Sequence, residues 1–244
     1  MAWQDPRITF GQPPVGAASQ TQVAFDAGLR TYMLKVYNYM ASGVLLTGIV
    51  AMLFASSGLA QDIMFGGGPL KWLIILSPLA IVFAMSFGQN KFSTVTIQAM
   101  FWAFAALMGL SMSTIFLVYT GASIAQTFFA TAAAFLGLSL YGYTTKKDLS
   151  GMGTFLIMGV IGLLVAMVIN IFLQSTMMQL VISAIGVLIF AGLTAYDTQR
   201  IKSMYAYVAG TDMVGKTVVL SALSLYLDFI NMFQFLLFFM GNQE

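Results

Sequence analysis

The sequence predicts an all-α polytopic membrane protein in which seven transmembrane helices form one domain and the last helix is central in the bundle. Of the 244 residues, 59% are hydrophobic and only 7% are charged. In a soluble domain of this length roughly a quarter of all residues are charged, and these residues keep its surface hydrated. The apolar residues also gather in successive segments of about 20 residues, the helix length that crosses roughly 30 Å of hydrocarbon.

The predicted elements follow one another with mostly short connections. Residues 1–30 are rich in Gly, Pro, Gln and Ala, and we expect a flexible cytoplasmic N-terminal tail with at most a short helix, not a signal peptide. Residues 31–244 form the predicted seven-helix transmembrane domain. Its spans are expected near residues 36–57, 71–88, 95–118, 122–143, 153–173, 178–199 and 217–240.

The composition excludes most catalytic chemistry. The chain has no cysteine and no histidine, so thiol nucleophiles, Fe–S clusters and the commonest zinc and haem ligand are absent. The net charge of +2 is too small and scattered to predict nucleic acid as a partner. The triplet Gly66–Gly68 lacks the Gly-Lys-Ser/Thr ending of a phosphate loop, so we interpret it as a flexible loop. We therefore expect neither an enzyme nor a bound cofactor.

The positions of lysine and arginine predict the orientation in the membrane. With seven spans, the ten basic side chains divide nine to one, and Lys71 is alone on its side. The N-terminus is therefore expected in the cytoplasm and the C-terminus outside. A re-entrant last segment would instead give six full spans and an internal C-terminus, and the C-terminal tail carries no basic residue that decides between the two.

The final span contains a carboxyl group near its centre. Asp228 is the only charged residue between positions 217 and 240, and an aspartate there costs on the order of 3 kcal/mol on insertion scales. Ser221, Ser224, Asp228 and Asn231 are spaced as one polar stripe on an otherwise apolar helix. We therefore expect this helix at the centre of the bundle, with its stripe toward other helices or a water-filled path.

The preceding span carries a second acid, Asp197, near its cytoplasmic end, with Thr194 three residues earlier on the same face. If Asp197 and Asp228 meet in a low dielectric, they share a proton, because two adjacent carboxylates cannot both ionise cheaply. The pair would then sense pH near neutrality and bind Ca²⁺ weakly during transit. In the structural alternative, Asp228 hydrogen-bonds a neighbouring helix and Asp197 caps its own helix beside Arg200.

Residues 143–150, YTTKKDLS, are interpreted as structural. Lys146 and Lys147 are expected to anchor the cytoplasmic boundary of the membrane, and Asp148 to form a cap or a local pair.

Three segments together resemble the Bax inhibitor family: KKDLS at 146–150, YDTQRIK at 196–202 and LSLYLDFINMF at 223–233. They occur in the family's order, and the resemblance covers residues 30–240. It implies a bacterial member in the inner (plasma) membrane, with a seven-helix fold whose last helix is surrounded by the other six. It also implies pH-sensitive passage of calcium controlled by an aspartate pair, which corresponds here to Asp197 and Asp228.

Some members of this family also have an acid in the second span and an arginine near its cytoplasmic end that latches onto the aspartate pair. Here the second span has no acid, contains Pro78 and ends without an arginine. Only Lys91, or Gln89 as a neutral donor, is available to replace the latch.

The leading functional prediction is a pH-sensitive calcium or cation leak channel, or a cation/proton exchanger, whose partners are the lipid bilayer, calcium and protons. The second is a non-transporting modulator that binds membrane proteases or death regulators, roles that the family resemblance also implies. A remote alternative is an intramembrane aspartyl protease, which likewise places Tyr-Asp in one span and an aspartate in the next. Such enzymes have Gly-x-Gly-Asp at the second aspartate, whereas residues 225–228 here are Leu-Tyr-Leu-Asp.

Overall fold

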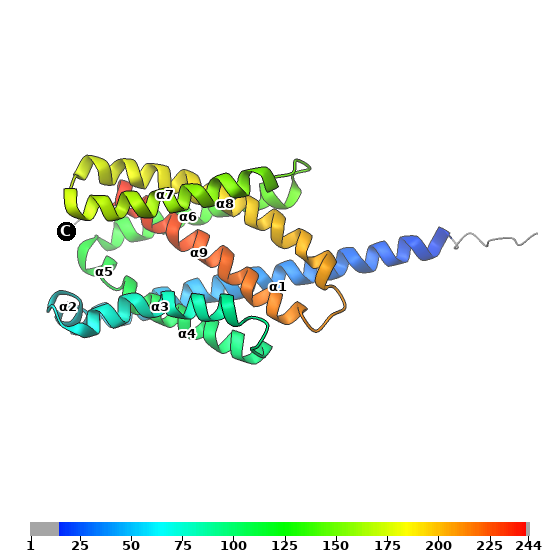
Figure 1. Cartoon of the computed structure of the whole chain (residues 1–244), viewed down its shortest axis with the longest axis horizontal. Helices are drawn as coiled ribbons and strands as arrows, with labels where there is room; N and C mark the ends of the chain where they lie inside the picture. The colour runs from blue at the N-terminus through cyan, green and yellow to red at the C-terminus, as the bar shows by residue number, and fades with distance from the viewer. Residues whose placement is uncertain (1–14, 243–244) are drawn as a thin grey trace, which may run out of the picture.

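The computed structural model describes residues 15–242, and this part of the chain is helical apart from short connections (Figure 1). Seven of its helical segments are long and apolar enough to cross a membrane, as predicted. In chain order the helices are α1 (Val15–Ser56), α2 (Leu59–Phe65), α3 (Pro69–Gly88), α4 (Thr94–Met112), α5 (Ile115–Val118), α6 (Gly121–Thr144), α7 (Ser150–Leu173), α8 (Thr176–Val208) and α9 (Val214–Met240). The short helix α5 extends α4, and the two together form the third span.

Helix α1 begins earlier than the sequence suggested. Residues 15–30, which we assigned to the N-terminal tail, continue into the first span as one helix of 42 residues. Pro14 is the last proline before this segment, and the Ala- and Gln-rich residues that follow favour helix, so nothing interrupts it. The rest of the predicted tail, residues 1–14, lies outside the described residues. The start of α1 projects well beyond the other helices (Figure 1).

Hydroxyl side chains define the beginnings of several spans. Ser93 caps α4 by accepting a hydrogen bond of 3.1 Å from the backbone N–H of Thr96. Thr120 caps α6 and Ser175 caps α8 in the same way. Each cap satisfies a backbone donor that has no partner within its own helix.

Helix α9 is the central helix, which confirms the prediction from its polar stripe. It runs between a group formed by α1, α3 and α4 and a group formed by α6, α7 and α8 (Figure 1). It packs directly on α8, α1, α6 and α4, and its residues are buried more often than those of any other span. Helices α3 and α7 are outer helices that pack mainly on α4 and α8. Four helices rather than six therefore make most of the contacts with α9.

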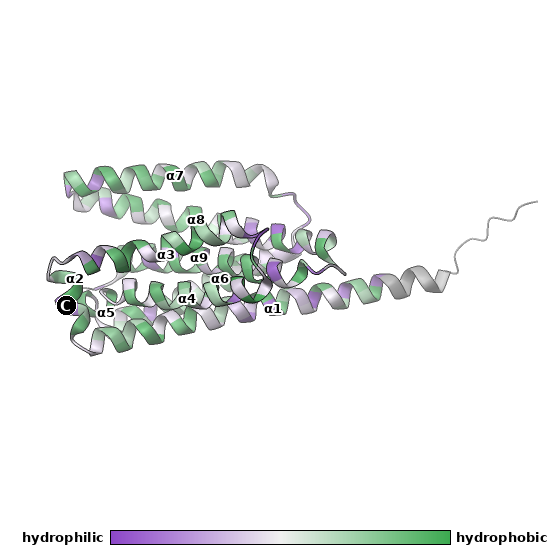
Figure 2. Ribbon diagram, turned by 60° about the horizontal axis from the view of Figure 1, so that its bottom comes forward, coloured by the Kyte–Doolittle hydropathy of each residue, from purple (hydrophilic) through white to green (hydrophobic). Residues whose placement is uncertain are grey.

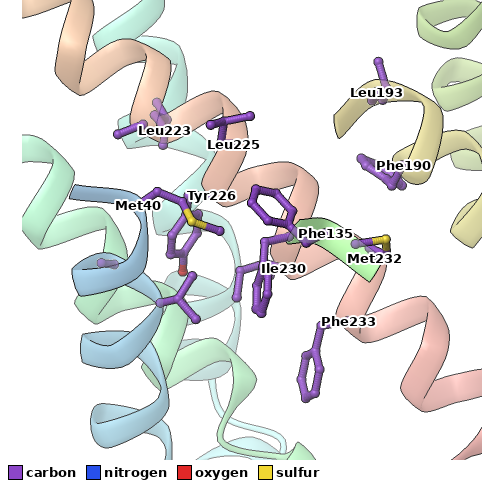
Figure 3. Packing of buried hydrophobic residues seen from close by; sticks show 14 of the residues in the cluster. Met40, Phe135, Phe190, Leu193, Leu223, Leu225, Tyr226, Ile230, Met232 and Phe233 are labelled. Carbon is purple, nitrogen blue, oxygen red and sulfur yellow. The ribbon is translucent and has the colours of Figure 1, made fainter. Parts of the chain in front are cut away.

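The buried face of α9 packs through aromatic side chains. Tyr226 is fully buried and points from α9 toward α1, beside Met40 (Figure 3). Its ring lies 5.2 Å from the ring of Phe104 in an edge-to-face arrangement. Its hydroxyl pairs with the hydroxyl of Thr47 at 2.6 Å, so the polar tip of this buried side chain has a partner.

The two ends of the bundle differ in charge. We call "basic end" the end at which the connections 89–93, 145–149 and 209–213 lie, together with the projecting part of α1. Apart from Lys71, every lysine and arginine of the described residues lies in the half of the molecule toward this end. Hydrophilic residues gather there, whereas the helices beyond it are mostly hydrophobic (Figure 2).

The described part of the chain ends at the opposite end of the bundle, which we call the far end. The backbone N–H of Asn242 donates to Ser123 at the start of α6, at 2.9 Å. Helix α9 has 27 residues, or about 40 Å of helix, and therefore crosses the whole bundle. This placement favours seven full spans over the six-span alternative with a re-entrant last segment.

Candidate functional site

The candidate site begins with Asp228, which α9 holds in the interior of the bundle. Only 4% of this residue is exposed. Its Oδ2 is buried and has no hydrogen-bond partner among the residues that the structure describes. An unsatisfied buried polar group costs about 1–3 kcal/mol, and more when it is charged. The bundle therefore retains a carboxyl group that does not contribute to its stability, which is typical of a functional residue.

Asp197 is also buried, and α8 directs it toward α9 rather than toward its own helix. Its Oδ2 accepts a hydrogen bond from the hydroxyl of Ser224. Ser224 lies four residues before Asp228, about 6 Å along the helix axis. The bridge between α8 and α9 is therefore an aspartate–serine pair, located one turn closer to the basic end than Asp228.

No hydrogen bond among the described residues joins the two carboxyl groups, because Asp197 pairs with Ser224 instead. The direct contact on which proton sharing between Asp197 and Asp228 depends is therefore not formed in this structure. Asp197 enters near the basic end of α9 and meets Ser224 first, because Ser224 precedes Asp228 by one turn on the same stripe.

A polar cavity of about 300 Å³ lies at the basic end, between α3, α8 and α9. Asp197 and Ser224 line it, and Leu227 is the lining residue of α9 that lies furthest along the helix from the basic end. Asp228 does not line this cavity. The other lining residues are Val82, Ser86, Gln89, Arg200, Ile201, Met204, Met213, Lys216, Thr217, Leu220, Ser221 and Leu223. A cavity at the basic end therefore leads to Asp197 and stops short of Asp228.

The rest of the predicted polar stripe divides between different partners. Ser221 pairs with the hydroxyl of Tyr32 on α1, at 3.2 Å. Asn231 donates to the carbonyl of Leu227 in its own helix, at 2.8 Å. Asn231 also lines a separate cavity of about 220 Å³ between α7, α8 and α9.

Thr194 does not line the cavity that contains Asp197. Its hydroxyl donates to the carbonyl of Phe190 in its own helix at 2.8 Å, and the residue is fully buried. One turn later on α8, Thr198 does reach another helix, because its hydroxyl pairs with that of Ser139 on α6 at 3.0 Å.

Lys91 does not occupy the position of a latch. It is exposed in the turn after α3 and is absent from the lining of the cavity, whereas Gln89 lines it. The two cations that line the cavity are Arg200 and Lys216, and the ammonium group of Lys216 lies 3.5 Å from the carbonyl of Gln89.

Sequence reasoning did not place Arg200 and Lys216 in this cavity, although helical spacing contains the signal. Arg200 follows Asp197 by three residues and Lys216 precedes Ser224 by eight. Residues three or eight positions apart lie on the same broad face of a helix.

The connection between α6 and α7 is held against α8. Asp148 accepts a hydrogen bond of 2.9 Å from the backbone N–H of Ser150, the first residue of α7, so its contact is local, as predicted. The side chain and the backbone N–H of Ser150 lower the pKa of the Asp148 carboxyl group, so it is ionised at neutral pH. Gln199 on α8 accepts from the N–H of Leu149 and donates to the carbonyl of Lys147, each at 2.8 Å.

Comparison with known proteins identifies relatives over nearly the whole chain. Residues 29–244 match the family described as "Inhibitor of apoptosis-promoting Bax1". An uncharacterized protein of Rickettsia prowazekii is 48% identical over 221 residues, which cover 90% of this chain and 93% of the relative. The inner membrane protein YbhL of Escherichia coli is 44% identical over 220 residues, covering 89% and 94% of the two chains.

Proposed function

Because the chain belongs to the Bax inhibitor family, we propose that it is a pH-sensitive leak pathway for calcium or other cations across a bacterial inner membrane. The observation that carries the proposal is the unpartnered carboxyl oxygen of Asp228, held in the bundle beyond the inner end of a polar cavity. Carboxylate and hydroxyl oxygens are the ligands that Ca²⁺ prefers. Two carboxylates are too few to hold the ion firmly, which suits passage rather than storage.

The described conformation corresponds to a closed pathway. The cavity is lined by Ser224, Asp197 and Leu227, and the deeper Asp228 does not line it. The Ser224–Asp197 hydrogen bond holds α8 and α9 together at this level. Opening requires that these two helices separate or rotate, so that an ion passes from the Asp197 carboxylate to the Asp228 carboxylate.

Protons enter the mechanism through the same two groups. An aspartate surrounded by protein is costly to ionise without a partner, and proton binding removes both that cost and its attraction for a cation. Proton binding at Asp197 also weakens its charge-assisted bond with Ser224. The pH dependence therefore arises from Asp197, Ser224 and Asp228 together rather than from a proton held between two carboxyl groups.

The basic end is proposed to face the cytoplasm, because lysine and arginine accumulate on the cytoplasmic side of membrane proteins. The cavity then opens toward the cytoplasm, and the far end with the C-terminus lies outside. Arg200 and Lys216, the two cations that line the cavity, would then lie at the cytoplasmic mouth of the pathway.

The protease alternative fits this geometry less well. An aspartyl protease activates water between two facing carboxyl groups. Here Asp197 faces Ser224, and no hydrogen bond of the described part of the chain connects it with Asp228.

Reconstitution tests the proposal. The purified protein, alone in liposomes that contain a calcium-sensitive dye, should admit calcium at a rate that changes with pH. A coupled movement of protons in the opposite direction would identify an exchanger rather than a channel. Absence of ion flux from correctly inserted protein would contradict the proposal and favour a non-transporting modulator, which co-purification from membranes would then identify.

A further inference from the structure

A second polar pocket, of about 340 Å³, lies at the basic end beside α8, and neither Asp197 nor Asp228 lines it. It lies between the connection 145–149 and the end of α8 that carries Arg200. We call it the loop pocket. Its lining residues are Lys146, Lys147, Asp148, Ser150, Tyr196, Gln199, Arg200 and Ser203.

The loop pocket concentrates positive charge. Lys146, Lys147 and Arg200 contribute three cations, and Asp148 contributes one carboxylate, which leaves a net charge of +2 (3 − 1). The Asp148 carboxylate already accepts the backbone N–H of Ser150. The three cations are exposed at the surface, so a ligand can reach them.

The pocket is fixed in position. Gln199 on α8 forms two hydrogen bonds with the backbone of the connection, to Leu149 and Lys147, each at 2.8 Å. Lys202 donates to the carbonyl of Tyr143 at the end of α6, also at 2.8 Å. The backbone that carries the two lysines is therefore held over Arg200 before any ligand arrives, which reduces the ordering cost of binding.

The surroundings indicate the kind of ligand. Helix α7 begins at the pocket with Ser150, and Met152 and Phe155, within its first two turns, are 43% and 74% exposed. Large exposed apolar side chains on a transmembrane helix contact lipid tails, so the pocket lies where the hydrocarbon layer ends and the headgroups begin. Basic pockets at this level, on the cytoplasmic side, bind anionic lipid headgroups.

We propose that the loop pocket binds the phosphate group of an anionic phospholipid, whose acyl chains lie along the exposed face of α7. Lys146 and Lys147 supply point charges, and the Arg200 guanidinium supplies paired N–H donors to the phosphate oxygens.

Arg200 connects this pocket with the candidate site, because it lines both the loop pocket and the cavity that contains Asp197. A bound phosphate attracts the guanidinium group toward the loop pocket and away from the mouth of the cavity. This consequence rests on the proposed function: anionic lipid should then raise calcium flux, because a repelling charge leaves the entrance of the pathway.

Binding is tested first, without any flux measurement. The full-length protein, purified in detergent, is incubated with phosphatidylglycerol or phosphatidylcholine, and the bound lipid is counted by native mass spectrometry. We expect one tightly bound phosphatidylglycerol and no equivalent phosphatidylcholine. Replacing both lysines, Lys146→Gln with Lys147→Gln, should weaken this binding at least about fivefold, since a basic residue near an anionic surface contributes about that factor.

The matched control is Lys35→Gln with Lys91→Gln, which removes two exposed lysines of the basic end that do not line the pocket. Arg200→Gln is a second variant that leaves the connection 145–149 intact, and it should also weaken binding. Equal loss in the pocket and control variants, or no loss in either pocket variant, would overturn the proposal. Displacement of the lipid by millimolar inorganic phosphate would show a site for soluble phosphate and would overturn the lipid assignment.

The connection with transport is tested separately, in liposomes with and without phosphatidylglycerol. Wild-type flux should rise with phosphatidylglycerol, and the double variant Lys146→Gln/Lys147→Gln should lose this dependence. A wild-type protein that binds the lipid but passes no ions would refute the proposed function and leave the lipid site intact. Flux that is independent of phosphatidylglycerol, with binding present, would refute only the role of Arg200 at the cavity.

Discussion

Asp197 on α8 accepts a hydrogen bond from Ser224 on α9, and Ser224 stands one helical turn before Asp228. This contact joins the two helices at the inner end of the polar cavity. It also explains why two acids in adjacent spans come close without being bonded to each other: a serine takes the position that direct pairing requires. The predictions below follow from this arrangement and from the packing around it.

Removing the hydroxyl of Ser224 should loosen the contact between α8 and α9. We expect Ser224→Ala to lower the free energy of unfolding by about 1 kcal/mol, within the range of hydrogen bonds between helices in membranes. Thermal unfolding of the purified protein measures this loss. Ser203→Ala is the matched control, because Ser203 is exposed and bonds only to the carbonyl of Arg200 in its own helix. Equal effects of the two substitutions would contradict a special role for Ser224.

Gly186 permits the close contact between α8 and α9 toward the far end. A Cβ atom at this position would lie 2.6 Å from the Phe235 ring. Gly186→Ala should therefore destabilise the protein by about 1–3 kcal/mol through overpacking. Gly162→Ala should be neutral or stabilising, because nothing lies within 4 Å of a Cβ there and alanine favours helix. The unfolding temperatures of the two variants measure these effects. If Gly186→Ala and Gly162→Ala lowered the unfolding temperature equally, the helices would not pack as described.

The cations at the cavity should affect the resting leak according to their positions. Lys216→Ala removes a positive charge from the cavity lining and should raise calcium entry, because that charge repels the ion. Lys91→Ala should leave the leak unchanged, since Lys91 does not line the cavity. Flux into dye-loaded liposomes compares the two variants. A leak raised by Lys91→Ala alone would restore Lys91 as the latch residue.

The proposed orientation places the C-terminus outside the cytoplasm. A reporter that is active only in the cytoplasm, fused after Glu244, should give no signal, and the same reporter at the N-terminus should be active. The opposite pattern would invert the proposed orientation, and two active fusions would indicate an even number of spans.

Much of the fold could be predicted from the sequence, because hydrophobic length and polar spacing are local properties. The seven apolar segments correspond to the seven long helices, and the stripe through Asp228 indicated the central position of α9. The start of α1 at Val15 was missed because a helix that projects beyond the bundle lacks the apolar run that marks a span.

The partners within the site could not be predicted, because they depend on how far two helices slide along each other. A shift of one turn, about 5.4 Å, decides whether Asp197 meets Ser224 or Asp228, and no spacing within one helix encodes this shift. Local geometry decided the other two positions: the hydroxyl of Thr194 bonds to its own helix, and Lys91 lies in the turn after α3 and does not line the cavity.

The central claim is that Asp228 and Asp197 together make ion passage sensitive to pH. The most direct test is calcium flux into liposomes across a range of pH for the wild type, Asp228→Asn, Asp197→Asn and the double variant, with Asp212→Asn as a control because Asp212 is exposed in the connection 209–213. Each single variant of the pair should lose most of the pH dependence while remaining folded and inserted, and the double variant should add little, because neighbouring groups that act together are not additive. Asp212→Asn should retain the wild-type profile. An unchanged pH profile in Asp228→Asn or in Asp197→Asn would contradict the claim, and additive effects of the two substitutions would show two independent sites.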